Sequence, residues 1–479
     1  MNTSGTNPKT KARDLWIKNA NNKYQLNVII SPLEGINETG SKIILMEDLE
    51  KRKKIYGICG ECNEPGTGRR WCQSCNSKRF KENFKNWTSG NKNIDELIQQ
   101  SQLNAVHYKK CLEWIPYEKF EDITYITRGG FGKIYSANWP EGFIRFWDIE
   151  NQKWDRCPNV KVALKCLDNS SNLSKVFLNE IKSHLQIYIF DIIQCYGITQ
   201  DPTTKDYMMV LFYCANGNLR QHLINRHKPI NYNSKIENLT EIASGLLNIH
   251  NSGRIHKDFH SGNILYGEFG RPHISDLGMC QPANHDNESG NEGTYGVIPY
   301  MAPEVLRGHP YEKASDIYSF GIVMNELMSE VIPYNEEPHD HILAIKICKG
   351  HRPKISEGTP KLIADLITKC WDANPKNRPT ANELYQQLKK WKIEMYNNNS
   401  EIKSQIKKCN KNKLKNKPRS QSHPQAIYIS RQISFKNLPE PTNSTNSHSD
   451  DNTPSPLSNL ISECMDCQLS ELDLNEDDE

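Results

Sequence analysis

The sequence has 479 residues, of which only 36% are hydrophobic, so part of the chain is expected not to fold, because compact domains usually reach about 45–50% with glycine counted. The net charge of +3 singles out no class of partner, and the 15 cysteines, an odd number, favour a reducing compartment over a disulfide framework. No apolar run approaches the ~18 residues of a membrane span, and the N-terminus has no apolar core of a signal peptide. We therefore expect a cytoplasmic protein.

The first part of the chain is expected to hold little regular structure. Residues 1–22 are polar and predicted to be disordered, and residues 23–54 are predicted to form short strands or irregular structure. After a cysteine-rich stretch, residues 86–116 are predicted to be a helical linker, because apolar residues over 93–107 recur at helical spacing. A capping-box pattern at Asn93 marks the start of that helix.

Four cysteines within residues 55–85 follow the spacing C-x2-C-x9-C-x2-C: Cys59, Cys62, Cys72 and Cys75. Two C-x-x-C knuckles place four thiolates around one tetrahedral Zn²⁺, and the lack of a histidine or carboxylate ligand favours a structural zinc over a catalytic one. A redox pair needs only one C-x-x-C, and unpaired cysteines without a metal are the remaining alternative. The pattern predicts a small zinc-ribbon-like module that could dock a protein partner.

Basic and aromatic residues surround these cysteines, among them Arg69, Arg70, Trp71 and Phe80. Aromatic side chains among positive charges could bind RNA or an acidic partner. A solvated module surface explains the same charges more simply, so a nucleic-acid ligand is disfavoured.

A glycine-rich stretch, ITRGGFGKIY at 126–135, lies between two strand-like segments. Glycines in such a turn let backbone N–H groups approach phosphates closely, and Gly129 and Gly132 are placed for this. Glycines of an ordinary hairpin are the alternative. By itself, a glycine-rich loop is weak evidence for a phosphate site.

A lysine on a buried strand comes next, Lys165 in VALKCL. A buried cation is costly unless it is paired, and Glu180 in the helix-like VFLNEIKSHL is the obvious partner. Further on, HKDFHSGN supplies Asp258 and Asn263, and SDLG supplies Asp276. A carboxylate can orient an attacking hydroxyl, while Asn263 and Asp276 offer the oxygen ligands that Mg²⁺, or Mn²⁺, prefers.

The order and spacing of these motifs, with YMAPE and CWDANPKNRPT after them, make residues 117–396 resemble a protein kinase domain of the tyrosine-kinase-like group. The resemblance implies an α+β fold of two lobes, a mainly β N-lobe and a helical C-lobe, with ATP between them. It implies that Asp258, Lys165, Glu180, Asn263 and Asp276 are catalytic. It also implies that Glu304 pairs with Arg378.

The resemblance further implies a nucleotide pocket. The residues expected to line it, besides the glycines and Lys165, are Ile126, Ile134, Ala163, Leu265 and the hinge residues Phe212, Tyr213 and Cys214, with Leu211 as gatekeeper.

The acceptor hydroxyl is less clearly marked. His260 stands where serine/threonine kinases usually carry a lysine, and no arginine of the tyrosine-kinase type is present. Tyr300 before MAPE tilts the prediction toward serine/threonine. The expected function is an ATP-dependent protein kinase in intracellular signalling, acting on protein substrates. The alternatives are a pseudokinase scaffold, or a zinc-ribbon binding module with a non-catalytic kinase domain.

The last part of the chain, residues 397–479, is predicted to be a disordered tail, because a basic block at 401–419 and an acidic block at 463–479 flank a stretch rich in Ser, Pro and Asn. Nuclear entry through the basic block is an alternative to a purely cytoplasmic location.

Overall fold

The computed structural model describes residues 16, 28–29, 44–129, 132–167, 175–187, 191–226, 228–283, 294–411 and 421–443. The chain divides into two compact units, and every element below lies in the first, Met1–Thr442. The predicted disorder of residues 1–22 lies outside the described residues apart from Trp16, and so does the acidic block at 463–479.

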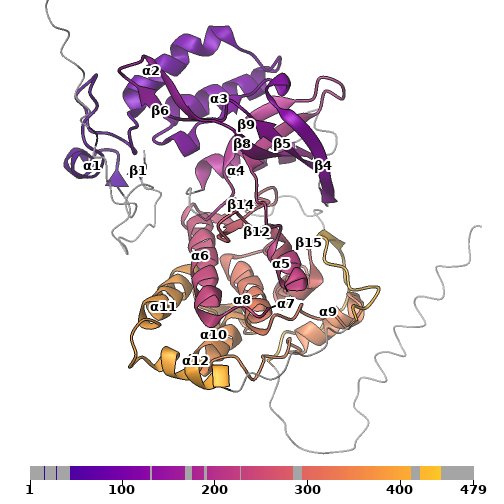
Figure 1. Ribbon diagram of the computed structural model, residues 1–479. Helices are drawn as coiled ribbons and strands as arrows, with labels where there is room; N and C mark the ends of the chain where they lie inside the picture. Colours follow the sequence, from indigo (N-terminus) through magenta and orange to yellow (C-terminus); the bar gives the residue numbers. More distant parts are fainter. Residues whose placement is uncertain are drawn as a thin grey trace, which may run out of the picture. The chain divides into compact units, whose positions relative to one another are not determined.

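A six-stranded sheet forms the upper lobe (Figure 1). Its strands run in the order β3-β9-β10-β8-β5-β4, and their bounds are Glu113–Trp114 (β3), Glu121–Gly129 (β4), Gly132–Trp139 (β5), Val160–Leu167 (β8), Cys195–Gln200 (β9) and Tyr207–Phe212 (β10). β-branched and aromatic residues are frequent in these strands, as is usual where a sheet packs on a core. β5 pairs with β8 so that Ile134 lies opposite Lys165, which brings the glycine-rich turn next to the predicted catalytic lysine.

One helix, α4 (Lys175–Gln186), packs against this sheet. Phe177 and Ile181, four residues apart, are buried in the same cluster as the sheet residues, so one helical face is fixed on the lobe. The buried ammonium of Lys110 donates to carbonyls at the C-terminal end of α4, including that of Leu185 at 2.6 Å. A cation at this end of a helix satisfies carbonyls that have no partner within the helix.

Residues 86–116 belong to the upper lobe and are not a separate linker. The predicted helix is present as α3, Lys92–Asn104, and ends before residue 107. Its Ile94 and Ile98 are fully buried in the sheet cluster, and β3 adds a parallel strand beside β9. The helical spacing therefore marked a face that covers the sheet.

The N-terminal elements are short: β1 (Val28–Ile29), β2 (Ile44–Leu45), α1 (Leu49–Tyr56) and α2 (Gln73–Asn83). Residues 44–83 are called the cysteine module here. A hairpin between β5 and β8 reaches this module; its strands are β6 (Phe143–Asp148) and β7 (Lys153–Cys157). Trp154 of the hairpin stacks on Phe80 and Trp71, with ring centroids 4.7 and 5.9 Å apart. Both module aromatics are buried against the hairpin, so they are not exposed for stacking on bases.

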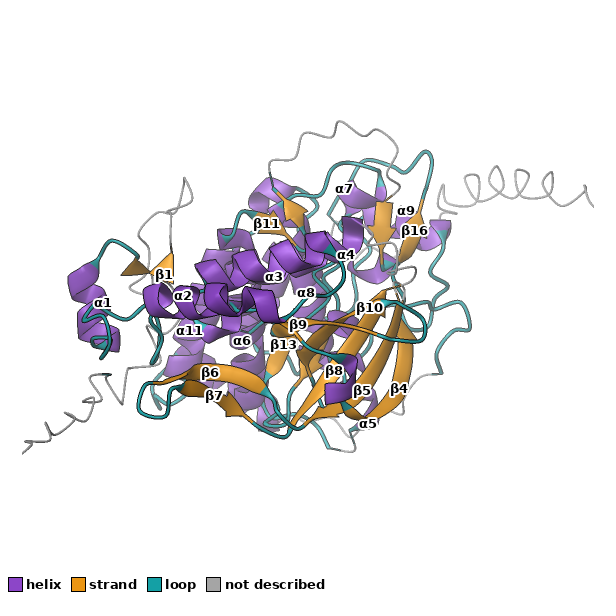
Figure 2. Cartoon of the chain, turned by 90° about the horizontal axis from the view of Figure 1, so that it is seen from above, coloured by secondary structure: helices purple, strands orange, loops and turns teal. Residues whose placement is uncertain are grey.

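The lower lobe is mainly helical (Figures 1 and 2). Its helices are α5 (Leu219–Asn225), α6 (Tyr232–Asn251), α7 (Pro303–Leu306), α8 (Lys313–Ser329), α9 (His341–Cys348), α10 (Lys361–Cys370) and α11 (Ala381–Glu394). Its short strands are β11 (Arg254–Ile255), β12 (Ile264–Tyr266), β13 (Pro272–Ile274), β14 (Gln281–Pro282) and β15 (Thr294–Gly296). None of the helices in the described ranges is both long and apolar enough to cross a membrane.

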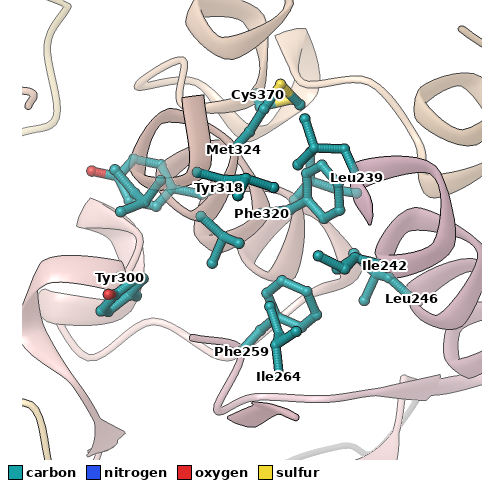
Figure 3. Packing of buried hydrophobic residues seen from close by; sticks show 14 of the residues in the cluster. Leu239, Ile242, Leu246, Phe259, Ile264, Tyr300, Tyr318, Phe320, Met324 and Cys370 are labelled. Atoms are coloured by element: carbon teal, nitrogen blue, oxygen red, sulfur yellow. The ribbon is translucent and has the colours of Figure 1, made fainter. Parts of the chain in front are cut away.

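The core of the lower lobe anchors residues 256–263, which hold Asp258 and Asn263 and are called the predicted catalytic loop here. Figure 3 shows Phe259 and Ile264 in one cluster with Leu239 of α6 and Phe320 of α8. The rings of Phe259 and Phe320 stack with centroids 6.0 Å apart. Because α8 is buried along most of its length, it gives the loop a rigid base.

The chain beyond residue 396 differs from the predicted disordered tail. Helix α12, Glu401–Lys411, buries Ile402 and Ile406 in the core of the lower lobe. Residues 421–442 also pack on this lobe and include β16, Arg431–Ile433. Composition misled here because a few apolar residues at the right spacing suffice to hold a polar segment on a lobe that is already folded.

Candidate active site

Lys165 on β8 contacts two carboxylates from different elements. Its Nζ lies 2.6 Å from Glu180 Oε1 on α4 and 2.8 Å from Asp276 Oδ1. Burial alone lowers the pKa of Lys165, but the two carboxylates raise it above its ordinary value, so the side chain is a cation. The predicted Lys165–Glu180 pair is confirmed. The ammonium group of Lys165 thus links the sheet to α4 and to the lower lobe.

The predicted catalytic loop is held by Asp316 of α8, which is buried. Its carboxylate accepts hydrogen bonds from the backbone N–H of His256 at 2.8 Å and of Lys257 at 3.0 Å. His250 Nε2 lies 2.9 Å from the same carboxylate. Lys257 has a φ of 70°, a left-handed conformation that is rare for a residue with a side chain. The two backbone bonds hold this turn, which immediately precedes Asp258.

Asp258 is a buried carboxylate with an incomplete set of partners. Asn263 Nδ2 donates to its Oδ2 at 3.2 Å, and the His260 Nε2 lies 3.5 Å away. Oδ1 makes no hydrogen bond within the described residues. Burial raises the pKa of Asp258, but His260 and the Ser430 hydroxyl outweigh burial and lower it to about 2. The carboxylate is therefore ionised at neutral pH.

Asn263 and Asp276, the predicted magnesium ligands, come from the two ends of one hairpin. The amide N–H of Asn263 donates a hydrogen bond to the Asp258 carbonyl at 2.9 Å. The amide oxygen of Asn263 is therefore the atom that could bind a metal ion. Asp276 has a φ of 59°, the second left-handed residue of the site. One amide oxygen and one carboxylate suit Mg²⁺ when nucleotide phosphates and water complete the shell.

The residues predicted to line a nucleotide pocket come from both lobes. Ala163, Phe212, Cys214 and Leu265 are half-buried and pack against one cluster of the upper lobe. Gly129 and Gly132 pair across the β4–β5 hairpin. A side chain at Gly132 would place its Cβ 2.0 Å from the Cys166 carbonyl oxygen, so that position requires glycine. The two residues between these glycines lie outside the described residues.

Two further pocket residues differ in exposure. Ile134 is half-buried, whereas Ile126 is 45% exposed at the edge of the hairpin. The position of Ile126 in the predicted pocket stays a prediction, and ligand pockets are lined mainly by apolar groups such as this one.

The four predicted zinc ligands come together. The sulfur atoms of Cys59, Cys62, Cys72 and Cys75 all lie within 4.8 Å of one another, with Cys59–Cys75 at 3.9 Å and Cys62–Cys72 at 3.6 Å. A tetrahedral zinc with Zn–S bonds of about 2.3 Å requires S–S edges of about 3.8 Å. The donor set therefore fits Zn²⁺. The second knuckle opens helix α2, so the module combines a cysteine loop with a helix.

Sequence reasoning missed two contributors to the site. Ser430 places its Oγ 2.5 Å from Asp258 Oδ2, and Lys110 caps the helix that carries Glu180. One signal for the first was available: AIYISRQISF is rich in Ile, Tyr and Phe, unlike its polar flanks. No sequence signal distinguishes Lys110 from the other lysines.

The two lobes and the placement of these charged residues between them are those of a protein kinase. The sequence profile of the protein tyrosine and serine/threonine kinase family matches residues 120–388, more than half of the chain. The chain belongs to this family. The matched residues do not reach the cysteine module.

Similar proteins include kinases of different acceptor preference. The chain is 29% identical over 237 residues to the serine/threonine/tyrosine-protein kinase HT1 of Arabidopsis thaliana, covering 48% of this chain and 59% of that protein. It is 26% identical over 294 residues to the tyrosine-protein kinase SPK-1 of Girardia tigrina, covering 59% and 55%. It is 27% identical over 274 residues to the receptor-interacting serine/threonine-protein kinase 4 of Mus musculus, covering 54% and 32%. The matches thus span less than two thirds of each relative.

Proposed function

We propose that this protein is an active, cytoplasmic, ATP-dependent protein kinase that transfers the γ-phosphoryl group to serine or threonine hydroxyls of proteins. The observation that carries the proposal is the state of two charged residues. Lys165 is paired with Glu180, and Asp258 is ionised, with no hydrogen bond to its Oδ1 in the described part of the chain. A scaffold without catalysis would have no need of an ionised, buried carboxylate with a free oxygen.

Each residue has a distinct role in this proposal. Lys165, held by Glu180, contacts phosphate oxygens, while the hairpin glycines let backbone N–H groups approach them. Asn263 and Asp276 hold Mg²⁺ or Mn²⁺, which neutralises phosphate charge when bound. Asp258 orients the acceptor hydroxyl and takes its proton.

The preference for serine or threonine rests on how far the Asp258 carboxylate lies from the backbone of a bound segment. A serine hydroxyl of the chain itself, on Ser430, reaches Asp258 while its neighbours pair with β15. A tyrosine in the same place would push the backbone away from that strand, because its hydroxyl stands at the far end of a ring. Phosphoamino-acid analysis of the products distinguishes the two outcomes.

The cysteine module is proposed to hold one structural Zn²⁺ through Cys59, Cys62, Cys72 and Cys75. The donor geometry supports a closed four-thiolate site. Lys53, Lys54, Arg69 and Lys78 are exposed on the module, so a protein partner that offers acidic groups to them is the proposed ligand of the module.

The kinase proposal is tested by Lys165→Met in the full-length protein. Loss of the cation that positions phosphate should lower kcat/KM for transfer of labelled γ-phosphate to casein about 10²-fold, the usual cost of removing one stabilising charge. Burial raises the pKa of Glu180, so this carboxyl can take up a proton when its partner is lost and the fold should survive. Lys182→Met, an exposed lysine on the same helix, is the matched control. A wild type that transfers no phosphate would favour the scaffold alternative.

The zinc proposal is tested by metal analysis of freshly reduced full-length protein. One Zn²⁺ per chain is expected, and Cys62→Ser should weaken binding by more than the roughly 10–100-fold that loss of an outer-shell contact costs. A chelator should change the fluorescence of Trp71, which is buried beside the cluster. Cys157→Ser, a half-buried cysteine outside the cluster, should leave the stoichiometry unchanged. Zinc near zero in the wild type would contradict the proposal.

A further inference from the structure

Ser430 lies at the predicted catalytic carboxylate although it is 172 residues away along the chain. Its Oγ donates to Asp258 Oδ2 at 2.5 Å and lies 3.5 Å from His260 Nε2. An acceptor hydroxyl needs this proximity to a general base, about 2.6–3.2 Å or slightly less for a charged partner. The contact therefore places the Ser430 hydroxyl at the distance from Asp258 that the hydroxyl of a phosphoacceptor requires.

The residues after Ser430 continue as strand β16, which pairs with β15 of the lower lobe. β16 pairs antiparallel with β15, with Arg431 opposite Gly296 and Ile433 opposite Thr294. Addition of a strand to an exposed edge is a common way for a domain to bind an extended peptide. Ile433 is only 6% exposed and joins the core of the lower lobe, so this pairing is anchored by a buried side chain.

The residues before Ser430 are held by a different contact. Arg220 of α5 lies 4.5 Å from the centre of the Tyr428 ring and donates to the Tyr428 carbonyl at 3.1 Å. The Tyr428 hydroxyl donates to the Pro333 carbonyl at 2.8 Å. Tyr428 and Ser430 are half-buried, whereas Ile427 and Ile429 are exposed, which is the alternation of an extended chain.

Further contacts hold the rest of the segment. Arg307 Nη1 donates to Glu440 at 2.8 Å, and the N–H of Thr442 donates to the Cys348 carbonyl at 2.9 Å. Contacts thus lie on both sides of Ser430 and extend over residues 423–442. The segment is therefore bound to the lower lobe along most of its length, as a peptide ligand would be. Ser430 is the residue of the segment that contacts Asp258.

From this geometry we infer that Ser430 is an intramolecular phosphoacceptor and that residues 421–442 occupy the protein-substrate groove of their own chain. The inference rests on the proposed kinase function. The Ser430 Oγ attacks the γ-phosphorus of ATP, an O–P bond forms, the bond from that phosphorus to the β,γ-bridging oxygen breaks, and ADP leaves. The hydroxyl proton passes to Asp258 Oδ2 and then to solvent.

This placement has two consequences. Only residues 412–420 separate α12 from the docked segment, so the acceptor has a high effective concentration and other substrates must displace it. A phosphate on Ser430 carries a charge of about −1.5 to −2 beside the Asp258 carboxylate, and repulsion between them favours release of the segment. Modification of Ser430 therefore opens the groove to other proteins.

The inference is tested with full-length protein, Mg²⁺ and ATP, with phosphosites mapped by mass spectrometry. Dephosphorylated wild type should acquire phosphate at Ser430 with a first-order rate constant that does not change over a hundredfold range of protein concentration. Ser430→Ala should lose this phosphate, whereas Ser434→Ala, an exposed serine four residues on, should keep it. Casein phosphorylation is followed in the same samples.

A second variant tests docking without touching the acceptor. Tyr428→Ala should slow phosphorylation of Ser430 at least about tenfold, since an aromatic residue that anchors an interface commonly contributes more than 1.4 kcal/mol to binding. It should also lower the KM for casein, because the groove is less often occupied. Thermal unfolding checks that the lobe remains folded.

The outcomes separate this inference from the proposed function. Casein phosphorylated while Ser430 stays unmodified overturns the inference and leaves the kinase function standing. No transfer to any protein overturns both. A rate that rises in proportion to protein concentration shows transfer between molecules and overturns the intramolecular assignment.

Discussion

Replacing Asp258 with asparagine is expected to lower kcat for phosphoryl transfer about 10³–10⁴-fold, the upper part of the range for a positioned general base. The wild-type carboxylate is ionised because its surroundings lower its pKa to about 2, whereas an amide cannot accept the hydroxyl proton. ATP affinity should be nearly unchanged, because Lys165, Asn263 and Asp276 carry the nucleotide contacts in the proposed arrangement.

This prediction is checked by pairing steady-state kinetics on casein with a direct measurement of ATP binding. Asp365→Asn makes the same chemical change at an exposed helix residue that pairs with Lys361, and it should leave both quantities as in the wild type. Substantial turnover by the Asp258→Asn protein would mean that another group takes the proton. A parallel loss of ATP affinity would mean that Asp258 holds the nucleotide site together.

Short-range patterns predicted the charged site well because each of its parts has a local cause. Lys165 lies on a buried strand and Glu180 on the next helix. Because a buried cation needs a partner of opposite charge, pairing of these two residues was the simplest expectation. The four cysteines were equally predictable, since their spacing alone brings the sulfur atoms within reach. The antiparallel pairing of β5 with β8, which aligns the glycine turn with Lys165, was implied by the kinase resemblance.

The contacts made by the C-terminal segment could not be predicted in this way. β16 pairs over only three residues with a strand more than a hundred residues earlier, and no local propensity encodes so distant a partner. Because residues 401–419 are rich in basic residues, their composition suggested disorder. The four-residue spacing of Ile402 and Ile406, which is typical of one helical face, was therefore overlooked. Lys110 posed the same problem, because its role depends on which helix end lies over it in the folded lobe.

The predicted pair between Glu304 and Arg378 is also present, and it joins α7 to the loop before α11. Arg378 donates through both terminal nitrogens to the carboxylate, at 2.6 and 2.8 Å, and its side chain is fully buried. The same guanidinium donates to the carbonyl of Asp372 at 2.8 Å and lies 5.2 Å from the centre of the Tyr318 ring. The arginine thus ties three segments of the lower lobe together.

Arg378→Met is therefore expected to lower the free energy of unfolding by about 3–5 kcal/mol, because removing one partner of a buried ion pair leaves the other charge uncompensated. Denaturant unfolding followed by circular dichroism measures the change. Arg271→Met is the matched control: Arg271 is 57% exposed and lies 3.4 Å or more from its partners Glu241 and Asp191, so its loss should cost no more than about 1 kcal/mol.

A double variant, Glu304→Gln with Arg378→Met, separates the charge from the remaining contacts. If the unpaired carboxylate causes most of the loss, the neutral amide should recover a large part of it, and the double variant should be more stable than Arg378→Met alone. If the double variant is no more stable than the single one, the cost arises from the carbonyls and the Tyr318 ring that lose the guanidinium. In that case Arg378 holds the lobe mainly through hydrogen bonds to the backbone, and Glu304 only orients it.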